Sequence, residues 1–169
     1  MSYGFIGLGH QGSPMAERMI RAGLQPALWA RRQSVLEPYA DRGAVIMGSP
    51  AEVAAASDVI GLCLYDGAAT DGVVFGPGGI VEAVQPGSVM AIHSTVGPEY
   101  VKALADRLAG DGASVVDAPV SGGPAAETGQ LLVIAGGSEP DIELCTPMFA
   151  TYSNRVVHVG GIGAAQAAK

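Results

Sequence analysis

Short apolar runs alternate along the chain with longer segments in which apolar residues recur every three or four positions. The short runs are typical of strands buried on both faces of a sheet, and the longer segments are typical of amphipathic helices. The expected strands span residues 3–6, 26–30, 44–46, 58–64, 88–93, 114–120, 131–135 and 155–159. The expected helices span residues 12–22, 34–40, 98–108, 139–149 and 162–169, with one more starting at Ser49 and Pro50. This alternation predicts an α/β fold with a Rossmann-like, doubly wound and mostly parallel sheet.

The overall composition and charge argue against several classes of protein. With 169 residues the chain is long enough for one domain, and its 49% hydrophobic and 15% charged residues argue against disorder. The net charge of −7 argues against nucleic acid and against an anionic membrane as partners, because both need a basic face. We expect neither a signal peptide nor a transmembrane helix, because no apolar segment has the required length.

The two cysteines indicate a reducing compartment. Cys63 and Cys145 lie in apolar runs and show neither CxxC nor metal-ligand spacing. We therefore expect buried, reduced thiols, no metal site and a cytoplasmic location.

A glycine-rich segment follows the first expected strand directly and opens the first expected helix. It matches the pattern GxGxxG and consists of Gly7, Leu8, Gly9, His10, Gln11 and Gly12. In this context the first glycine allows a tight turn, the second lets a pyrophosphate approach the backbone, and the third lets the helix pack against the strand. The N–H groups at the start of the helix then face the phosphates. The segment predicts a dinucleotide site rather than a plain turn, and all six residues are candidate cofactor ligands.

The residues after the second strand indicate which nucleotide binds. In NAD-binding folds, an acidic residue about 20 positions past the glycines binds the ribose 2′-hydroxyl. Here that stretch holds Ala30, Arg31 and Arg32. A guanidinium group suits a 2′-phosphate, and no carboxylate is present to repel it. We predict binding of NADP(H), with NAD(H) as the other choice.

A second motif is the DAPVSGG segment at residues 117–123. Together with residues 4–16 and 160–169, it resembles the β-hydroxyacid dehydrogenase family. This family includes 3-hydroxyisobutyrate dehydrogenase, tartronate semialdehyde reductase and 6-phosphogluconate dehydrogenase. The order and spacing of the three segments match the family along essentially the whole chain.

The resemblance implies a role for each of several residues. Ser121, Gly122 and Gly123 would hold the carboxylate and hydroxyl of a small substrate, and glycine-rich turns do offer N–H groups to anions. Lys169 falls at the family's catalytic lysine and would donate a proton to the substrate oxygen or stabilise its negative charge. The cofactor would also be lined by Leu64, Tyr65, Asp66 and Thr95.

The resemblance also implies a domain organisation. Residues 1–160 correspond to the family's dinucleotide-binding domain, and residues 161–169 to the start of an interdomain helix that is truncated here. Family members continue into an all-helical domain that completes the substrate pocket and supports a homodimer or homotetramer. We therefore expect the isolated chain to be inactive without that domain. Gln11 departs from the family, in which methionine is frequent at this position.

Two other functions are compatible with parts of the sequence. Imine reductases resemble the first domain, although an imine needs no carboxylate-binding turn such as residues 121–123. A non-catalytic module that only holds nucleotide is the other alternative for the isolated chain. Among the remaining residues, we expect a structural role for His93 and packing roles for Trp29 and Tyr65.

Overall fold

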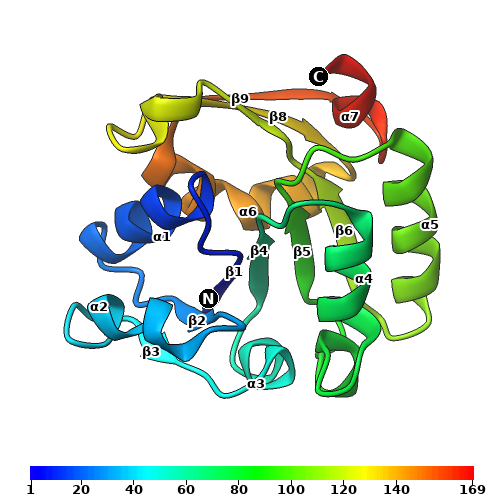
Figure 1. Ribbon diagram of the computed structural model, residues 1–169. Coiled ribbons are helices and arrows are strands. Elements are labelled where there is room, and N and C mark those ends of the chain that lie inside the picture. Colours follow the sequence, from blue (N-terminus) through cyan, green and yellow to red (C-terminus); the bar gives the residue numbers. More distant parts are fainter.

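The computed structural model describes residues 1–169 and shows a nine-stranded sheet flanked by helices (Figure 1). The strands are β1 Tyr3–Ile6, β2 Ala27–Trp29, β3 Val45–Ile46, β4 Val59–Leu62, β5 Val89–Ile92, β6 Ser114–Asp117, β7 Val120–Ser121, β8 Leu131–Gly136 and β9 Ser153–Gly160. The α-helices are α1 Gly12–Arg21, α2 Glu37–Ala40, α3 Pro50–Ala55, α4 Gly67–Phe75, α5 Pro98–Ala109, α6 Glu139–Tyr152 and α7 Ala164–Ala168. The 3-10 helices are η1 Gln33–Val35, η2 Ile80–Glu82 and η3 Gly123–Ala126. None of the helices combines the length and the apolar composition needed to cross a lipid bilayer.

The sheet has the strand order expected of a doubly wound fold. The order is β3-β2-β1-β4-β5-β6-β8-β7, and every pair from β3 to β6 is parallel. β8 pairs antiparallel with β6 and β7, and β9 pairs in parallel with β8. The strand order reverses between β1 and β4, and ligands bind beyond the carboxyl ends of the strands at such a reversal. The prediction of a Rossmann-like, mostly parallel sheet is confirmed.

The central strands contribute to two hydrophobic cores, one on each face of the sheet. In β1, Phe5 belongs to the core under α1, α2 and α6, whereas Ile6 belongs to the core under α3, α4 and α5 (Figure 1). β4 repeats this alternation with Val59 and Ile60. Successive side chains of a strand face opposite sides, so only a run that is apolar at every position can fill both cores. The continuous apolar runs therefore located these strands correctly.

Three segments differ from the sequence-based expectation. α4 was not predicted, because its apolar residues lie all around the helix and are mixed with glycines, which leaves no one-sided periodicity. The strand expected at residues 114–120 is split into β6 and β7, because Pro119 has no N–H for the sheet ladder. The helix expected at residues 34–40 is split into η1 and α2, because Pro38 fits only the first turn of a helix.

His93 is buried between the sheet and α6 and forms two hydrogen bonds. Its Nδ1 donates to the carbonyl oxygen of Ala118 at 2.8 Å, and its Nε2 accepts from the hydroxyl of Tyr152 at 3.0 Å. The ring stacks on Phe5 and meets Phe149 edge-on. Burial lowers the pKa of His93 to about 4, so the ring is neutral at pH 7. These contacts agree with the structural role expected for this residue.

The buried His93 predicts a loss of stability in mild acid. In the unfolded chain this residue takes up a proton near pH 6.5, whereas in the folded protein it does so only near pH 4. The unfolded state therefore binds more protons across this window, and the free energy of unfolding should fall by about 3 kcal/mol as the pH drops through it. Urea unfolding at several pH values measures this slope, and His93→Gln should flatten it. Equal slopes in the two proteins would contradict the assignment.

Candidate functional site

The glycine-rich turn joins β1 to α1 and uses its glycines in two different ways. Gly7 has φ +107°, and a Cβ at this position would overlap the backbone carbonyl of Cys63. A Cβ on Gly12 would overlap the carbonyl oxygen of Gly7. A Cβ on Gly9 would meet no atom within 4 Å. The fold therefore needs Gly7 and Gly12, whereas Gly9 keeps open the space in front of the turn.

A cavity of about 820 Å³, here called the glycine-turn cavity, opens beside this turn at the carboxyl ends of β1, β2 and β4. The predicted cofactor residues that line it are Gly7, Leu8, Gly9, Ala30, Arg31, Arg32, Leu64 and Tyr65. The lining residues that the sequence did not single out are Ile6, Trp29, Val35, Cys63, Ala68, Ala69, Gly72 and Val73. The last four belong to α4, so missing this helix also meant missing one wall of the cavity. The signal that the sequence did offer for α4 is Asp66, a residue type that favours the N-cap position of a helix.

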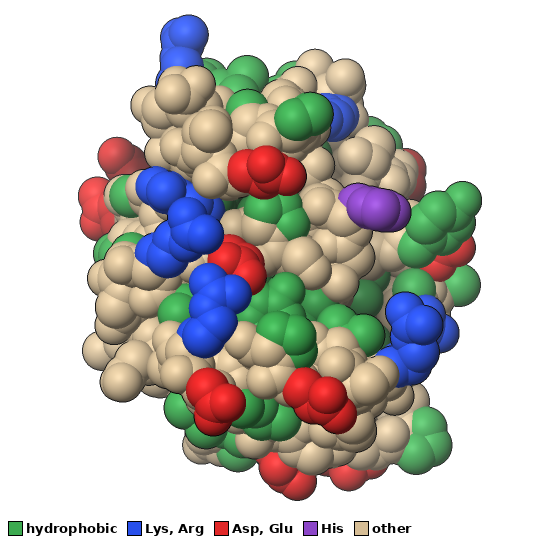
Figure 2. Space-filling view, turned by 60° about the vertical axis from the view of Figure 1, so that its left-hand side comes forward, with side chains coloured by type: hydrophobic (Ala, Val, Ile, Leu, Met, Phe, Trp, Pro, Cys, Tyr) green, Lys and Arg blue, Asp and Glu red, His purple; other side chains and the backbone are tan.

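The rim of the cavity is positively charged and has no carboxylate. Arg31 and Arg32 follow β2, are exposed, and take part in no salt bridge. Figure 2 shows the side of the molecule that carries α1 and α2, where basic and acidic side chains are interspersed. Some other basic groups are paired, as Arg42 is with Glu17. The two unpaired guanidinium groups are thus free to receive a phosphate.

The other polar groups of the cavity wall are structural. Burial raises the pKa of the Cys63 thiol to about 12, so this cysteine is uncharged at neutral pH and is no nucleophile. Trp29 is half-buried and donates from Nε1 to the carbonyl oxygen of Gly48 at 3.2 Å, which fixes its ring at the end of β2. The wall offers contact surface for a ligand rather than reactive groups.

The remaining predicted cofactor residues do not line the cavity; these are His10, Gln11, Gly12, Asp66 and Thr95. The carboxylate of Asp66 accepts from the N–H of Ala69 at 2.8 Å and caps α4. Thr95 is exposed in the loop between β5 and α5. The Nε2 of Gln11 is buried without a hydrogen-bond partner, which leaves a free donor at the start of α1. Tyr65 is 94% exposed, so the packing role expected for it was wrong.

The residues predicted to bind and convert the substrate lie close to one another. Ser121 ends β7, and Gly122 (φ +125°) and Gly123 (φ +48°) continue the chain in a conformation that glycine adopts without strain. All three are exposed. Lys169 follows α7, and its Nζ donates a hydrogen bond to the carbonyl oxygen of Val120. The structure therefore brings the ammonium group next to the Ser121 turn, which is distant in the sequence.

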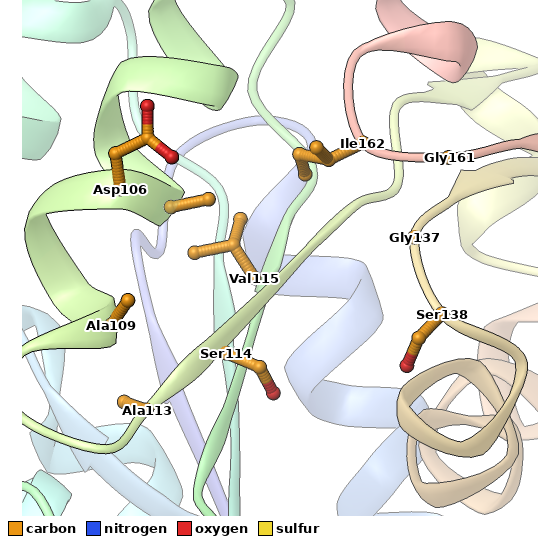
Figure 3. Close-up of a pocket in the computed structure, with 10 residues that line it drawn as sticks. Asp106, Ala109, Ala113, Ser114, Val115, Gly137, Ser138, Gly161 and Ile162 are labelled. Atoms are coloured by element: carbon orange, nitrogen blue, oxygen red, sulfur yellow. The ribbon is translucent and has the colours of Figure 1, made fainter.

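A second hollow of about 450 Å³ lies between α5, β6 and the start of α6 (Figure 3). Small side chains such as Ala109 and Ala113 line it, with the carboxylate of Asp106 on α5. It has no lysine, arginine, histidine or cysteine and none of the predicted site residues. No three His, Cys, Asp or Glu side chains come together as metal ligands anywhere in the structure. The candidate functional groups are therefore those of the glycine-turn cavity and the Ser121 turn.

The strand order, the glycine turn and the cavity define a dinucleotide-binding domain. The family described as the NAD binding domain of 6-phosphogluconate dehydrogenase matches residues 2–160. The chain belongs to this family, and its relatives are the β-hydroxyacid dehydrogenases that the sequence motifs resemble.

Two curated relatives show how far the similarity extends. The L-threonate dehydrogenase of Cupriavidus necator is 35% identical over 158 residues, which cover 93% of this chain and 53% of that enzyme. The mitochondrial 3-hydroxyisobutyrate dehydrogenase of Mus musculus is 35% identical over 167 residues, which cover 98% of this chain and 50% of that enzyme. The chain therefore spans about half the length of these relatives.

Solved structures share the fold along nearly the whole chain. Psf3 in complex with NADP+ and 2-OPP is 26% identical, with a TM-score of 0.92 over 98% of this chain and 59% of that one. The imine reductase of Streptomyces aurantiacus is also 26% identical, with a TM-score of 0.89 over 99% of this chain and 58% of that one. Proteins of this fold bind different ligands, so the fold alone does not identify the reaction, and the residues of the site have to indicate it.

Proposed function

We propose that this chain is the NADP-binding domain of an enzyme that transfers a hydride between NADP(H) and a small β-hydroxyacid or its semialdehyde. The observation that carries the proposal is the contact of Lys169 with Val120, which sets an ammonium group beside the exposed Ser121 turn. A substrate carboxylate bound by the N–H groups and the hydroxyl of this turn would lie within reach of Lys169.

Each group has a distinct task in this reaction. When bound in the glycine-turn cavity, the cofactor would supply the hydride chemistry through its nicotinamide. In reduction, the ammonium group of Lys169 donates a proton to the carbonyl oxygen, and in oxidation its neutral amine accepts the proton of the hydroxyl. The same group stabilises negative charge that develops on this oxygen. Ser121 and Gly122 hold the carboxylate and so fix the orientation of the substrate.

The residues around the glycine-turn cavity fit a dinucleotide with an additional phosphate. The space in front of Gly9 admits a pyrophosphate close to the first turn of α1. Arg31 and Arg32 are unpaired and suit a 2′-phosphate. The related Psf3 structure contains NADP+. We propose NADP(H) as the preferred cofactor, with NAD(H) bound more weakly.

A domain exchange tests the proposed reaction. In the chimera, this chain replaces the matching half of the L-threonate dehydrogenase of Cupriavidus necator. We expect the chimera to bind NADPH and to oxidise L-threonate or another small β-hydroxyacid with NADP+, followed by the appearance of NADPH fluorescence. The proposal fails if the chimera binds NADPH but transfers no hydride with any hydroxyacid, semialdehyde or ketoacid.

Imine reduction is the second candidate, because the imine reductase of Streptomyces aurantiacus shares the fold. The Ser121 turn argues against it, since an imine carries no carboxylate for the turn to bind. Offering the same chimera cyclic imines and semialdehydes separates the two reactions. A module that only holds nucleotide would bind NADPH and convert neither.

The proposal extends to the substrate, the partners, the compartment and the oligomeric state of the whole protein. The substrate is a small carboxylate, and we propose no nucleic-acid or membrane partner. The free thiols of Cys63 and Cys145 fit a reducing, cytoplasmic compartment. For the whole protein we propose a homodimer or homotetramer, which light scattering of the purified protein would measure.

A further inference from the structure

The short helix that carries Lys169 is attached to the sheet by a buried carboxylate. α7 lies against β8 and β9 near the end of the chain (Figure 1). Asp117 at the end of β6 is fully buried, and its two oxygens accept from the N–H groups of Gly163 and Gln166, each at 2.9 Å. Asp117 has no salt-bridge partner. A buried charge is costly unless hydrogen bonds compensate it, and both donors here belong to the start of α7.

Gln166 connects the same helix to the loop that contains Thr95. Its Nε2 donates to the carbonyl oxygen of Ser94 at 2.9 Å, and its Oε1 accepts from the N–H of Val96 at 3.0 Å. These two bonds flank Thr95 on both sides. The hydroxyl of Ser94 in turn accepts from the N–H of Leu64 at 2.9 Å, and Leu64 lines the glycine-turn cavity. One side chain of α7 is thereby linked to both loops predicted to line the cofactor.

We infer that Asp117 and Gln166, here called the α7 anchor, are positioning residues that hold Lys169 beside the substrate turn and link its position to the nucleotide loops. This inference rests on the proposed catalytic role of Lys169. The start of α7 is held at the sheet by the two hydrogen bonds that Asp117 accepts from the N–H groups of Gly163 and Gln166. The anchor acts through the backbone of α7 and of the Thr95 loop, and neither of its side chains is assigned to the substrate.

The chemistry of the anchor favours positioning over simple stabilisation. Well-packed apolar side chains at buried positions often stabilise a fold as well as buried polar groups do. Asp117 and Gln166 instead direct hydrogen bonds at four named backbone groups, two at the start of α7 and two around Thr95. Such bonds fix the register of α7 against the sheet, which non-directional apolar contacts do not. Loosening the anchor should therefore change both the environment of Lys169 and the nucleotide loop.

Chemical labelling can follow Lys169 selectively, because the chain has only two lysines, Lys102 and Lys169. Lys102 lies on α5 in an ion pair with Glu99, but its side chain lies close to Gly163 at the start of α7. The α-amino group of Met1 takes part in none of the contacts of α7 and serves as the internal reference. A limiting amount of acetic anhydride, with the products measured by mass spectrometry, gives the reactivity of Lys169 relative to that of this amino group.

Gln166→Met is the informative variant, because it keeps the length of the side chain and removes both of its hydrogen bonds. We expect the reactivity of Lys169 relative to the α-amino group of Met1 to rise by about 3- to 10-fold, the effect of one or two hydrogen bonds. We also expect the affinity for NADPH to fall by a similar factor. Gln85→Met, at an exposed position between η2 and β5, is the matched control and should change neither quantity.

Asp117→Asn gives a second variant, because it replaces one acceptor with an amino group that faces an N–H donor. It should shift the reactivity of Lys169 in the same direction. If both variants keep the melting temperature of the unsubstituted chain and the relative reactivity of Lys169 is unchanged in both, the inferred role of the α7 anchor is wrong. Failure of the proposed function gives a different result: the domain-exchange chimera would bind NADPH without transferring a hydride, while the relative reactivity of Lys169 would still rise in the Gln166→Met chain.

Hydrogen exchange of the unsubstituted chain decides the question where a variant does not fold. The N–H groups of Gly163, Gln166 and Val96 should exchange at one common slow rate, because the anchor opens as a unit. Rapid exchange at Gly163 and Gln166, with protection at Val96 alone, would show that α7 is not held and would overturn the inference.

Discussion

Replacing Gly9 with alanine is expected to remove most of the affinity for NADPH while leaving the stability of the fold unchanged. The added Cβ meets no protein atom within 4 Å, so the fold has no reason to change. It would occupy the space through which the pyrophosphate reaches the N–H groups at the start of α1. Losing one or two charge-assisted hydrogen bonds corresponds to a fall in affinity of about 10- to 100-fold. Calorimetric titration measures the affinity, and thermal unfolding measures the stability.

Gly12→Ala is the matched comparison, because it should lower the stability of the fold, whereas Gly9→Ala should lower the affinity for NADPH. Its Cβ would overlap the carbonyl oxygen of Gly7, so either α1 or the turn has to move. We expect the free energy of unfolding to fall by about 3 kcal/mol. A Gly9→Ala protein that binds NADPH as tightly as the unsubstituted chain would show that the nucleotide does not lie against this turn.

Replacing both Arg31 and Arg32 with alanine should lower the affinity for NADPH by about 100-fold, because each hydrogen bond to a charged group contributes about 1.5–3 kcal/mol. The affinity for NADH should remain the same, since NADH has no 2′-phosphate for these guanidinium groups to bind. Both side chains are exposed and form no salt bridge, so their removal costs the fold little. Parallel titrations of the variant with the two nucleotides measure the effect.

Arg155→Ala provides the control for the loss of one positive charge, which each of the two substitutions causes. This arginine is exposed on β9 and forms no salt bridge. A comparable loss of NADPH affinity in this variant would mean that overall charge, rather than contact with the 2′-phosphate, explains the effect. Equal losses for NADPH and NADH in the Arg31 and Arg32 variant would also contradict the assignment.

The strands that were predicted correctly are those whose successive side chains are buried on opposite faces of the sheet. β1 and β4 are apolar at every position because Phe5 and Ile6, like Val59 and Ile60, pack into opposite cores. The glycine turn was predictable because strand, glycines and helix follow one another directly. In both cases, the physical constraint acts on neighbouring residues and is therefore visible in a short segment.

The features that the sequence missed depend on contacts between distant segments or on a helix without a one-sided pattern. α4 packs against the sheet and also lines the glycine-turn cavity, so its apolar residues are not confined to one face. In the sequence, Asp117 is only the first residue of a motif, and Gln166 is only part of a family segment. Asp117 contacts Gln166 across 49 residues, and Gln166 contacts Ser94 across 72 residues, so no local spacing reveals these contacts.

We propose that the glycine-turn cavity binds a dinucleotide with a 2′-phosphate. Calorimetric titration of the 169-residue chain with NADPH and, separately, with NADH tests this proposal. We expect saturable binding of both nucleotides, with NADPH clearly the tighter ligand. Tighter binding of NADH would contradict the roles of Arg31 and Arg32, and no binding of either nucleotide would contradict the assignment of the cavity itself.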